Sequence, residues 1–174
     1  MKVGILGGGR WGQALARLAL AAGNQPLIAY ADKKDKPPHI LPSTKDVPSV
    51  SASCDLLLVA TSASRVQAAM ELAQPHPGNR VVVAGRGIDA STGRWLCDIV
   101  REHSPVLRVG TIAGPAPVDE ILNGGLCAGV VASPFQEVRD MVQTALHSSR
   151  YRMYGSPDLQ GVQLASAAVP PPAP

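Results

Sequence analysis

The sequence predicts an α/β fold in which helices cover both faces of a doubly wound parallel sheet. Short, uninterrupted apolar runs, typical of strands buried on both faces, alternate along the chain with segments of helical periodicity. A glycine-rich turn joins the first apolar run to the first helical segment, the order expected of a βαβ unit. At 174 residues and 45% hydrophobic, the chain is long enough for one compact domain.

Predicted strands and helices follow one another with one interruption. Strands are expected at residues 2–6, 27–30, 55–60, 80–84, 106–112 and 127–132, with a short one at 151–154. Helices are expected at residues 13–22, from Ser62 or Ser64 to residue 73, and at 92–102, 118–122 and 135–147. Residues 31–53 break the rhythm, because four prolines and many polar residues there favour a long loop in place of a full helix.

The most specific motif is the turn after the first strand, Gly7-Gly8-Gly9-Arg10-Trp11-Gly12. In this G-x-G-x-x-G pattern, Gly7 permits the tight turn, Gly9 lets the backbone approach a pyrophosphate, and Gly12 lets the helix pack closely on the strand. The helix N-terminus adds unpaired N–H groups and a positive dipole end. The turn therefore predicts a Rossmann-like dinucleotide site formed by Gly7, Gly8, Gly9, Arg10, Trp11 and Gly12. The alternative is a purely structural glycine turn.

Asp32 bears on which dinucleotide is bound. It follows Gly12 by twenty residues, the position of the acid that accepts hydrogen bonds from the adenosine ribose, which favours NAD. Lys33 and Lys34 beside it are able to neutralise a 2′-phosphate, so NADP remains the alternative.

Ligands of such a sheet bind at the carboxyl ends of the strands. Thr61 and Ser62, directly after the strand at 55–60, are therefore the remaining candidate cofactor-binding residues. Arg65 and Arg86 are the cations expected to face the same crevice, because each closely follows a predicted strand.

The rest of the composition excludes several other functions. The formal net charge of +3 is spread along the chain without a basic stripe, so no nucleic-acid partner is expected. No apolar run reaches membrane-spanning length and the chain begins directly with a strand, so neither a membrane span nor a signal peptide is expected. Four scattered histidines give no metal site. The three cysteines lie far apart and suit reduced thiols in the cytoplasm: Cys54, Cys97 and Cys127.

Further motifs accompany the glycine turn in order. They are Ile40-Leu41-Pro42, Gly85-Arg86-Gly87-Ile88 with Thr92-Gly93, Ala113-Gly114-Pro115 followed by Glu120, Gly124 through Ala132-Ser133, and Tyr151-Arg152-Met153-Tyr154 leading to Asp158 and Gly161-Val162-Gln163-Leu164. With the turn, they resemble the NAD(P)-dependent glycerol-3-phosphate dehydrogenases from residue 1 to about residue 168. The resemblance implies a dinucleotide-binding domain at residues 1–155, the start of an interdomain helix at 156–168, and a helical C-terminal domain that closes over the glycerol phosphate.

The chain departs from the family pattern at two positions. Arg86 stands where the resembled motif has an active-site lysine, and Val169 stands where the second family lysine would fall. Arginine stays protonated at ordinary pH, so it can hold an anion but accepts a proton poorly. The chain also ends at Pro174, so the family's helical domain is expected to be missing. No catalytic residue is assigned.

Two functions are consistent with this pattern. In the first, the chain is an NAD(H)-binding domain, inactive as a dehydrogenase by itself, that serves as a nucleotide-binding or interaction module. In the second, it is the nucleotide-binding part of an active glycerol-3-phosphate dehydrogenase that reduces dihydroxyacetone phosphate, either as a fragment or completed by another polypeptide. The absence of both lysines favours the first.

The carboxyl end predicts a contact with another protein. Ser156-Pro157-Asp158 is a good helix start, and the helix should run to about residue 168. Its apolar positions recur at helical spacing: Leu159, Val162 and Ala165-Ser166, widened by Leu164 and Ala168. An exposed apolar face tends to find a partner, so a homodimer or another protein contact is expected through residues 157–168. Residues 169–174 are expected to form a disordered proline-rich tail.

Overall fold

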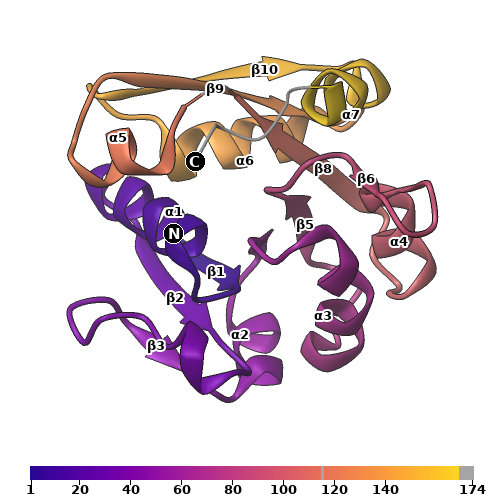
Figure 1. The fold of residues 1–174 in the computed structure, drawn as a ribbon, viewed down its shortest axis with the longest axis horizontal. Helices are drawn as coiled ribbons and strands as arrows, with labels where there is room; N and C mark the ends of the chain where they lie inside the picture. The colour runs from indigo at the N-terminus through magenta and orange to yellow at the C-terminus, as the bar shows by residue number, and fades with distance from the viewer. Residues whose placement is uncertain (115, 169–174) are drawn as a thin grey trace.

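Helices cover both faces of one eight-stranded sheet (Figure 1). The structure, a computed structural model, describes residues 1–114 and 116–168. Strands and helices alternate along most of the chain, which confirms the predicted α/β fold.

The strands of the main sheet are β1 (Lys2–Leu6), β2 (Gln25–Ala29), β3 (Ser43–Thr44), β4 (Leu56–Val59), β5 (Arg80–Val83), β8 (Arg108–Ala113), β9 (Cys127–Ala132) and β10 (Tyr151–Ser156). A separate antiparallel hairpin pairs β6 (Ile88–Asp89) with β7 (Arg94–Trp95). The helices are α1 (Arg10–Ala21), α2 (Val47–Ser53), α3 (Val66–Ala73), α4 (Leu96–Glu102), α5 (Val118–Leu122), α6 (Gln136–Leu146) and α7 (Leu159–Ala168). Two 3-10 turns are η1 (Lys33–Asp35) and η2 (Ala63–Arg65).

The strand order is β10-β9-β8-β5-β4-β1-β2-β3. The chain adds β2 and β3 on one side of β1 and then β4, β5 and β8 on the other, so the order reverses at β1, where ligands of doubly wound sheets bind. All pairs of the main sheet are parallel except β8 with β9. The predicted parallel sheet is therefore present except at this pair, where the chain returns from β8 through the short helix α5 and β9 runs antiparallel beside β8. An apolar run predicts a buried strand but not the direction in which that strand pairs.

The core lies in two layers, because the side chains of a strand alternate between the two faces of a sheet. In β4, Leu56 and Leu58 pack in the layer with α1 and α6, whereas Leu57 and Val59 pack in the layer with α2, α3 and α4. All four side chains are fully buried, which explains the uninterrupted apolar run.

Residues 31–53 are more ordered than the predicted long loop, because they form η1, the edge strand β3 and the helix α2. The Asp46 carboxylate accepts a hydrogen bond from the backbone N–H of Ser49 (3.3 Å) at the start of α2. Pro48 occupies the first turn of this helix, where a backbone N–H is not needed. This proline is therefore part of a helix start and not a helix breaker.

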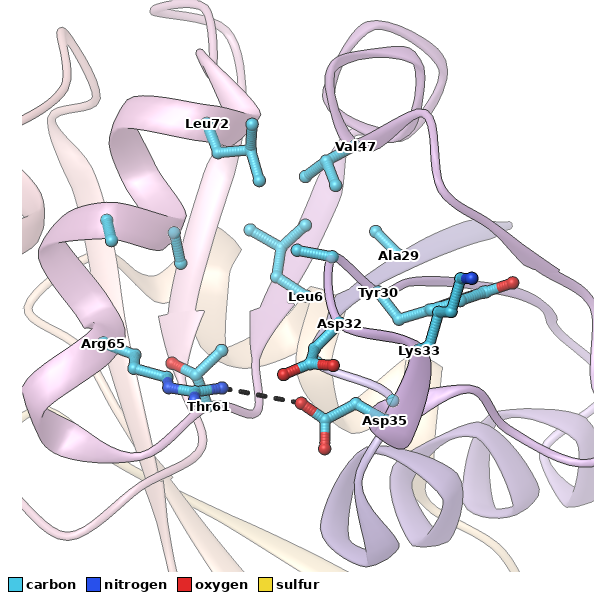
Figure 2. Close-up of a pocket in the computed structure, with 15 residues that line it drawn as sticks. Leu6, Ala29, Tyr30, Asp32, Lys33, Asp35, Val47, Thr61, Arg65 and Leu72 are labelled. Atoms are coloured by element: carbon cyan, nitrogen blue, oxygen red, sulfur yellow. Dashed lines mark ion pairs between the residues drawn. The ribbon is translucent and has the colours of Figure 1, made fainter.

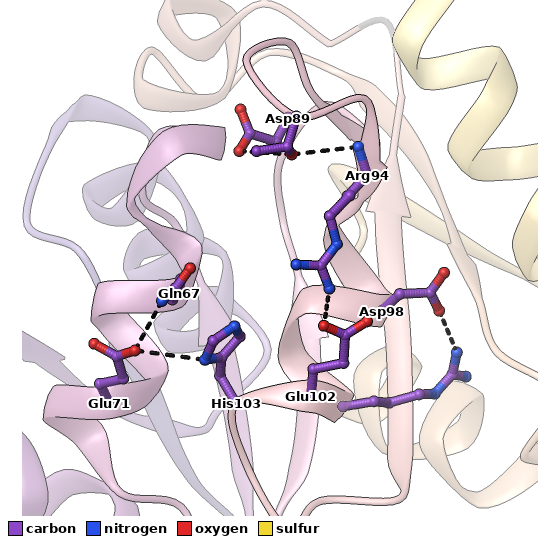
Figure 3. A network of polar contacts seen from close by, with 9 residues as sticks. Gln67, Glu71, Asp89, Arg94, Asp98, Glu102 and His103 are labelled. Atoms are coloured by element: carbon purple, nitrogen blue, oxygen red, sulfur yellow. Dashed lines mark hydrogen bonds and ion pairs between the residues drawn. The ribbon is translucent and has the colours of Figure 1, made fainter.

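The helix predicted at 92–102 is shorter in the structure, where it forms α4, because the first of the predicted residues belong to the β6–β7 hairpin. The Asp89 carboxylate folds the hairpin turn by accepting hydrogen bonds from the Ser91 N–H (3.0 Å) and the Thr92 hydroxyl (3.1 Å). These contacts, the Ser91 backbone N–H first, hold the pKa of Asp89 below its usual value. Arg94 of the hairpin forms an ion pair with Glu102 of α4 (Figure 3).

The helix predicted near the carboxyl end is present as α7, but its orientation differs from the prediction. Asp158 begins it in place of Ser156, since the Asp158 carboxylate accepts the Gly161 N–H (2.8 Å). Leu159 is buried and Val162 packs against the same core layer, so the expectation that these two side chains form an exposed stripe is wrong. Their own domain covers them. Val169 and the predicted tail at 169–174 lie outside the described residues.

Asn79 provides a test of the packing between α2 and β5. It is fully buried, its amide donates to the carbonyl oxygens of Ser51 (3.1 Å) and Cys54 (2.8 Å), and its side-chain oxygen accepts the His76 N–H (2.8 Å). Asn79→Ala leaves buried groups without partners, so urea denaturation should show the free energy of unfolding reduced by about 2–4 kcal/mol. The exposed Asn123→Ala is the control and should change it by at most about 0.5 kcal/mol. Equal losses in the two variants would contradict this role.

Candidate functional site

The glycine turn connects the end of β1 to the start of α1. Gly7 has a φ of +123°, in the region that favours glycine, and a Cβ there would lie 2.6 Å from the carbonyl oxygen of Ala60. A Cβ at Gly12 would overlap the carbonyl oxygen of Gly7. Glycine is therefore required at both positions, at Gly7 for the turn and at Gly12 for the close packing of α1 on the sheet.

Gly9 differs because the space beside it is open. A Cβ there would meet no heavy atom within 4 Å. Gly9 is the residue before α1 and, being glycine, has no side chain to cap the first N–H groups of that helix. Open space beside these N–H groups suits a phosphate group.

A pocket of about 560 Å³ lies beside the turn (Figure 2). Gly7 and Gly8 form the wall next to the turn. The apolar part of the wall comes from Leu6, Ala29, Val47, Ala68, Ala69 and Leu72. The polar part comes from Asp32, Lys33, Asp35, Thr61 and Arg65. An apolar cavity with a few polar groups at one side is typical of a small-molecule site.

Thr61 carries a buried hydroxyl oxygen that makes no hydrogen bond within the described structure. A buried polar atom without a partner costs free energy, and a ligand oxygen in this pocket would remove that cost. The neighbouring Ser62 is exposed, and its hydroxyl oxygen lies 3.4 Å from that of Ser64. Neither serine begins an α-helix as expected, because η2 comes first and α3 starts only at Val66.

Asp32 lies after β2 in the polar part of the wall. Its carboxylate accepts the backbone N–H of Lys34 (3.2 Å) and pairs with the Lys34 ammonium (3.3 Å). These contacts, the backbone hydrogen bond first, hold the pKa of Asp32 below its usual value. An ionised carboxylate at neutral pH can accept hydrogen bonds from ribose hydroxyls. Lys34 is engaged by Asp32, whereas Lys33 lines the pocket.

Arg10 and Trp11, in the first turn of α1, contact elements on the other side of the turn. Arg10 forms an ion pair with Asp119 of α5. The indole N–H of Trp11 donates to the carbonyl oxygen of Ala84 (2.5 Å), just after β5. Trp11 therefore ties the glycine turn to the loop that carries Arg86.

Arg86 is exposed on this loop, whose far end is held by α7. The Gly87 N–H donates to the Ser166 hydroxyl oxygen (3.1 Å), and a Cβ at Gly87 would overlap the backbone of Gln163. Of the two cations expected in the crevice, Arg65 lines the pocket and Arg86 lies at the end of the neighbouring strand, outside the pocket wall.

Asp35 is a pocket residue that the sequence gives no reason to single out. Its carboxylate pairs with Arg65 (3.5 Å), and its backbone carbonyl lies where a Cβ at Gly8 would be (Figure 2). Only the folded chain brings η1 beside the glycine turn. The sequence offers no signal except that Asp35 follows Asp32 closely.

The described residues offer little chemistry elsewhere. Within 1–114 and 116–168, no group of three or more His, Cys, Asp or Glu side chains is placed to hold a metal ion. No helix in the same ranges is long and apolar enough to cross a membrane. Burial raises the pKa of the Cys97 thiol to about 12, so this thiol is protonated and a poor nucleophile.

Comparison with known proteins identifies the family. Residues 28–139 match the family described as NAD-dependent glycerol-3-phosphate dehydrogenase N-terminus. The chain belongs to this family. It is a glycerol-3-phosphate dehydrogenase-like NAD-binding domain, which confirms the resemblance seen in the sequence motifs.

Curated relatives extend the match over nearly the whole chain. A glycerol-3-phosphate dehydrogenase [NAD(P)+] of Acinetobacter baumannii (strain SDF) is 31% identical over 96% of this chain and 52% of the relative. Its counterpart in Pseudomonas fluorescens (strain Pf0-1) is 33% identical over 95% of this chain and 52% of the relative. The chain thus spans about half the length of the curated relatives it matches. The crystal structure of glycerol-3-phosphate dehydrogenase from Coxiella burnetii shares the fold, with a TM-score of 0.81 at 21% identity over 95% of this chain and 56% of that one.

Proposed function

We propose that this chain binds NAD(H) in the crevice beside the glycine turn and, by itself, does not interconvert glycerol 3-phosphate and dihydroxyacetone phosphate. The observation that carries the binding proposal is the buried hydroxyl oxygen of Thr61, which has no hydrogen-bond partner among the described residues and lies in the pocket lined by Gly7 and Gly8. The next residue of the turn, Gly9, has open space beside it. The open space beside Gly9 leaves room for a phosphate group. A polar group of the ligand in the pocket would form the hydrogen bond that the Thr61 hydroxyl lacks.

Each part of the dinucleotide has a matching set of residues. The pyrophosphate would lie over residues 8–11, at the N-terminus of α1. The adenosine would enter the pocket with its apolar wall, where Asp32 would accept the ribose hydroxyls and Thr61 would bond to a ligand oxygen. The ionised Asp32 favours NAD, since it would repel a 2′-phosphate, and Lys33 supports the alternative, NADP. When bound, the nicotinamide supplies or accepts a hydride.

The proposal of inactivity rests on the two family lysine positions. Arg86 is a permanent cation and Val169 is apolar, so neither can accept or return the proton of the substrate hydroxyl. The second candidate is the nucleotide-binding part of an active enzyme that reduces dihydroxyacetone phosphate. The curated relatives support it, because they are dehydrogenases about twice as long as this chain.

We also propose a contact with a second copy of the chain or another protein through α7, now limited to the side that the domain leaves uncovered. Leu164 is 59% exposed there, beside the exposed Ala165 and Ala168. The buried free thiols of Cys54 and Cys97 suit a reducing compartment, and we propose the cytoplasm.

NADH binding is tested by the fluorescence of Trp11, measured in a Trp95→Phe background. NADH should change this fluorescence, and Gly9→Val should abolish the change, because its branched side chain would fill the space needed by the phosphates. The matched control is Gly155→Val on β10, where a Cβ would make ordinary contacts of 3.6 Å or more. It should bind as the wild type does. Identical isotherms for wild type and Gly9→Val would show that the site is wrongly assigned.

Turnover is tested by NADH oxidation with dihydroxyacetone phosphate, beside a mock purification. Wild-type protein should show no activity above the mock sample. Arg86→Lys should not restore it, because Val169 still lacks the second amine. Clear activity in either protein would overturn the proposed inactivity and favour the second candidate.

Self-association is tested by light scattering over a concentration series. Leu164→Glu should lower the apparent mass if α7 meets a second copy, because a charge would then be buried in the contact. Leu107→Glu, at another exposed leucine (68% exposed), is the control and should leave the mass unchanged. A monomeric wild type without a co-purifying protein would exclude this contact.

A further inference from the structure

Arg65 and Asp35, which both line the pocket, form an ion pair (Figure 2). The two side chains come from different segments, Asp35 from η1 after β2 and Arg65 from η2 after β4. Their guanidinium and carboxylate groups lie 3.5 Å apart, and the side chains are 54% and 35% exposed. Because solvent screens such a pair, it is weak enough to be exchanged for a stronger partner.

Both segments that carry the ion pair pass beside the glycine turn, Asp35 itself on one side and Thr61, four residues before Arg65, on the other. On one side, the carbonyl oxygen of Asp35 occupies the position of a Cβ at Gly8. On the other side, the backbone nitrogen of Thr61 lies 3.3 Å from the position of a Cβ at Gly7. The two segments that carry the pair therefore lie beside the two glycines next to which a pyrophosphate would lie.

A pyrophosphate at this turn would change the balance of charges around the ion pair. The guanidinium of Arg65 offers several N–H donors in a planar fork that matches phosphate oxygens, and such charge-assisted bonds are stronger than a screened surface pair. The Asp35 carboxylate carries the same sign of charge as the phosphates and opposes them. The two residues of the pair therefore act on a bound dinucleotide in opposite directions.

We propose that Arg65 is a phosphate-binding residue of this site and that Asp35 competes for it. When the dinucleotide enters, Arg65 exchanges the Asp35 carboxylate for the pyrophosphate oxygens. In the absence of ligand, Arg65 is paired with Asp35. This inference rests on the proposed NAD(H) binding and adds to it the residue that holds the phosphates and the residue that limits affinity.

The test is a double-mutant cycle on NADH affinity, measured by titration calorimetry on the full chain. Arg65→Gln should weaken binding about tenfold, through the loss of a charge-assisted bond. Asp35→Asn should strengthen binding about two- to fivefold, because it frees Arg65. In the Arg65→Gln background, the gain from Asp35→Asn should become much smaller, since there is no guanidinium left to free. Arg65→Lys should retain part of the affinity.

The control pair is Arg101 with Asp98 on α4, at 3.0 Å and with similar exposure. Arg101→Gln should leave NADH affinity unchanged. If Arg65→Gln behaved like Arg101→Gln, Arg65 would not be a phosphate ligand. If Asp35→Asn gave the same gain in both backgrounds, Asp35 would act by simple repulsion and the exchange would be wrong.

Two further ligands identify what Arg65 contacts, each measured by competition with NADH. Arg65→Gln should weaken ADP about as much as NADH but leave adenosine within about twofold, because adenosine carries no phosphate. An equal loss for adenosine would overturn the phosphate assignment. If wild type bound no NADH, the proposed function and this inference would both fall. If wild type bound NADH and Gly9→Val did not, an unaffected Arg65→Gln would overturn this inference alone.

Discussion

The close approach of α1 to β1 is the contact on which the candidate site depends. At Gly12 the helix lies so near the strand that the carbonyl oxygen of Gly7 takes the place of a side chain. This contact sets the apolar face of α1, with Ala14, Leu15 and Leu18, onto the sheet and brings the N-terminus of the helix to the carboxyl end of β1. A larger residue at position 12 would lift the helix and displace the N–H groups at its start. The packing of the core and the shape of the site therefore share one backbone contact.

The order of the strands gathers the remaining side chains around that contact. β1 lies between β2 and β4, and all three are parallel, so the segments that follow them meet at one edge of the sheet. Asp32 after β2 and Thr61 after β4 thereby line the same pocket as Gly7. The apolar wall opposite them comes from helices that cover the neighbouring strands, with Val47 from α2 and Leu72 from α3. The pocket is a consequence of the topology, since these residues are far apart in the sequence.

Features that depend on a local residue pattern could be predicted from the sequence, whereas features that depend on contacts between distant segments could not. A short continuous stretch of residues determines each strand buried on both faces, such as β4, and also the turn after β1. These elements were therefore predictable. Asp35 was not, because its place beside Gly8 depends on how η1 folds back over the turn. The antiparallel direction of β9 was also not predictable, since an apolar run has the same pattern in a parallel and in an antiparallel strand. For α7, the periodicity of Leu159 and Val162 revealed an apolar stripe but not that the domain's own core covers it.

The packing of α7 on the loop after β5 links the two positions at which this chain departs from the family pattern. Gly87, next to Arg86, contacts Gln163 and Ser166, which shortly precede Val169 in the sequence. The resemblance implies a lysine at each of those two positions, and in this chain the segments that lead to them are in contact. Arg86 keeps a positive charge on the loop, so attraction for an anion persists, but a guanidinium does not take up a proton. The loss of both amines, beside a packing that holds the two segments together, is the physical basis for proposing that this chain binds a dinucleotide without transferring a proton.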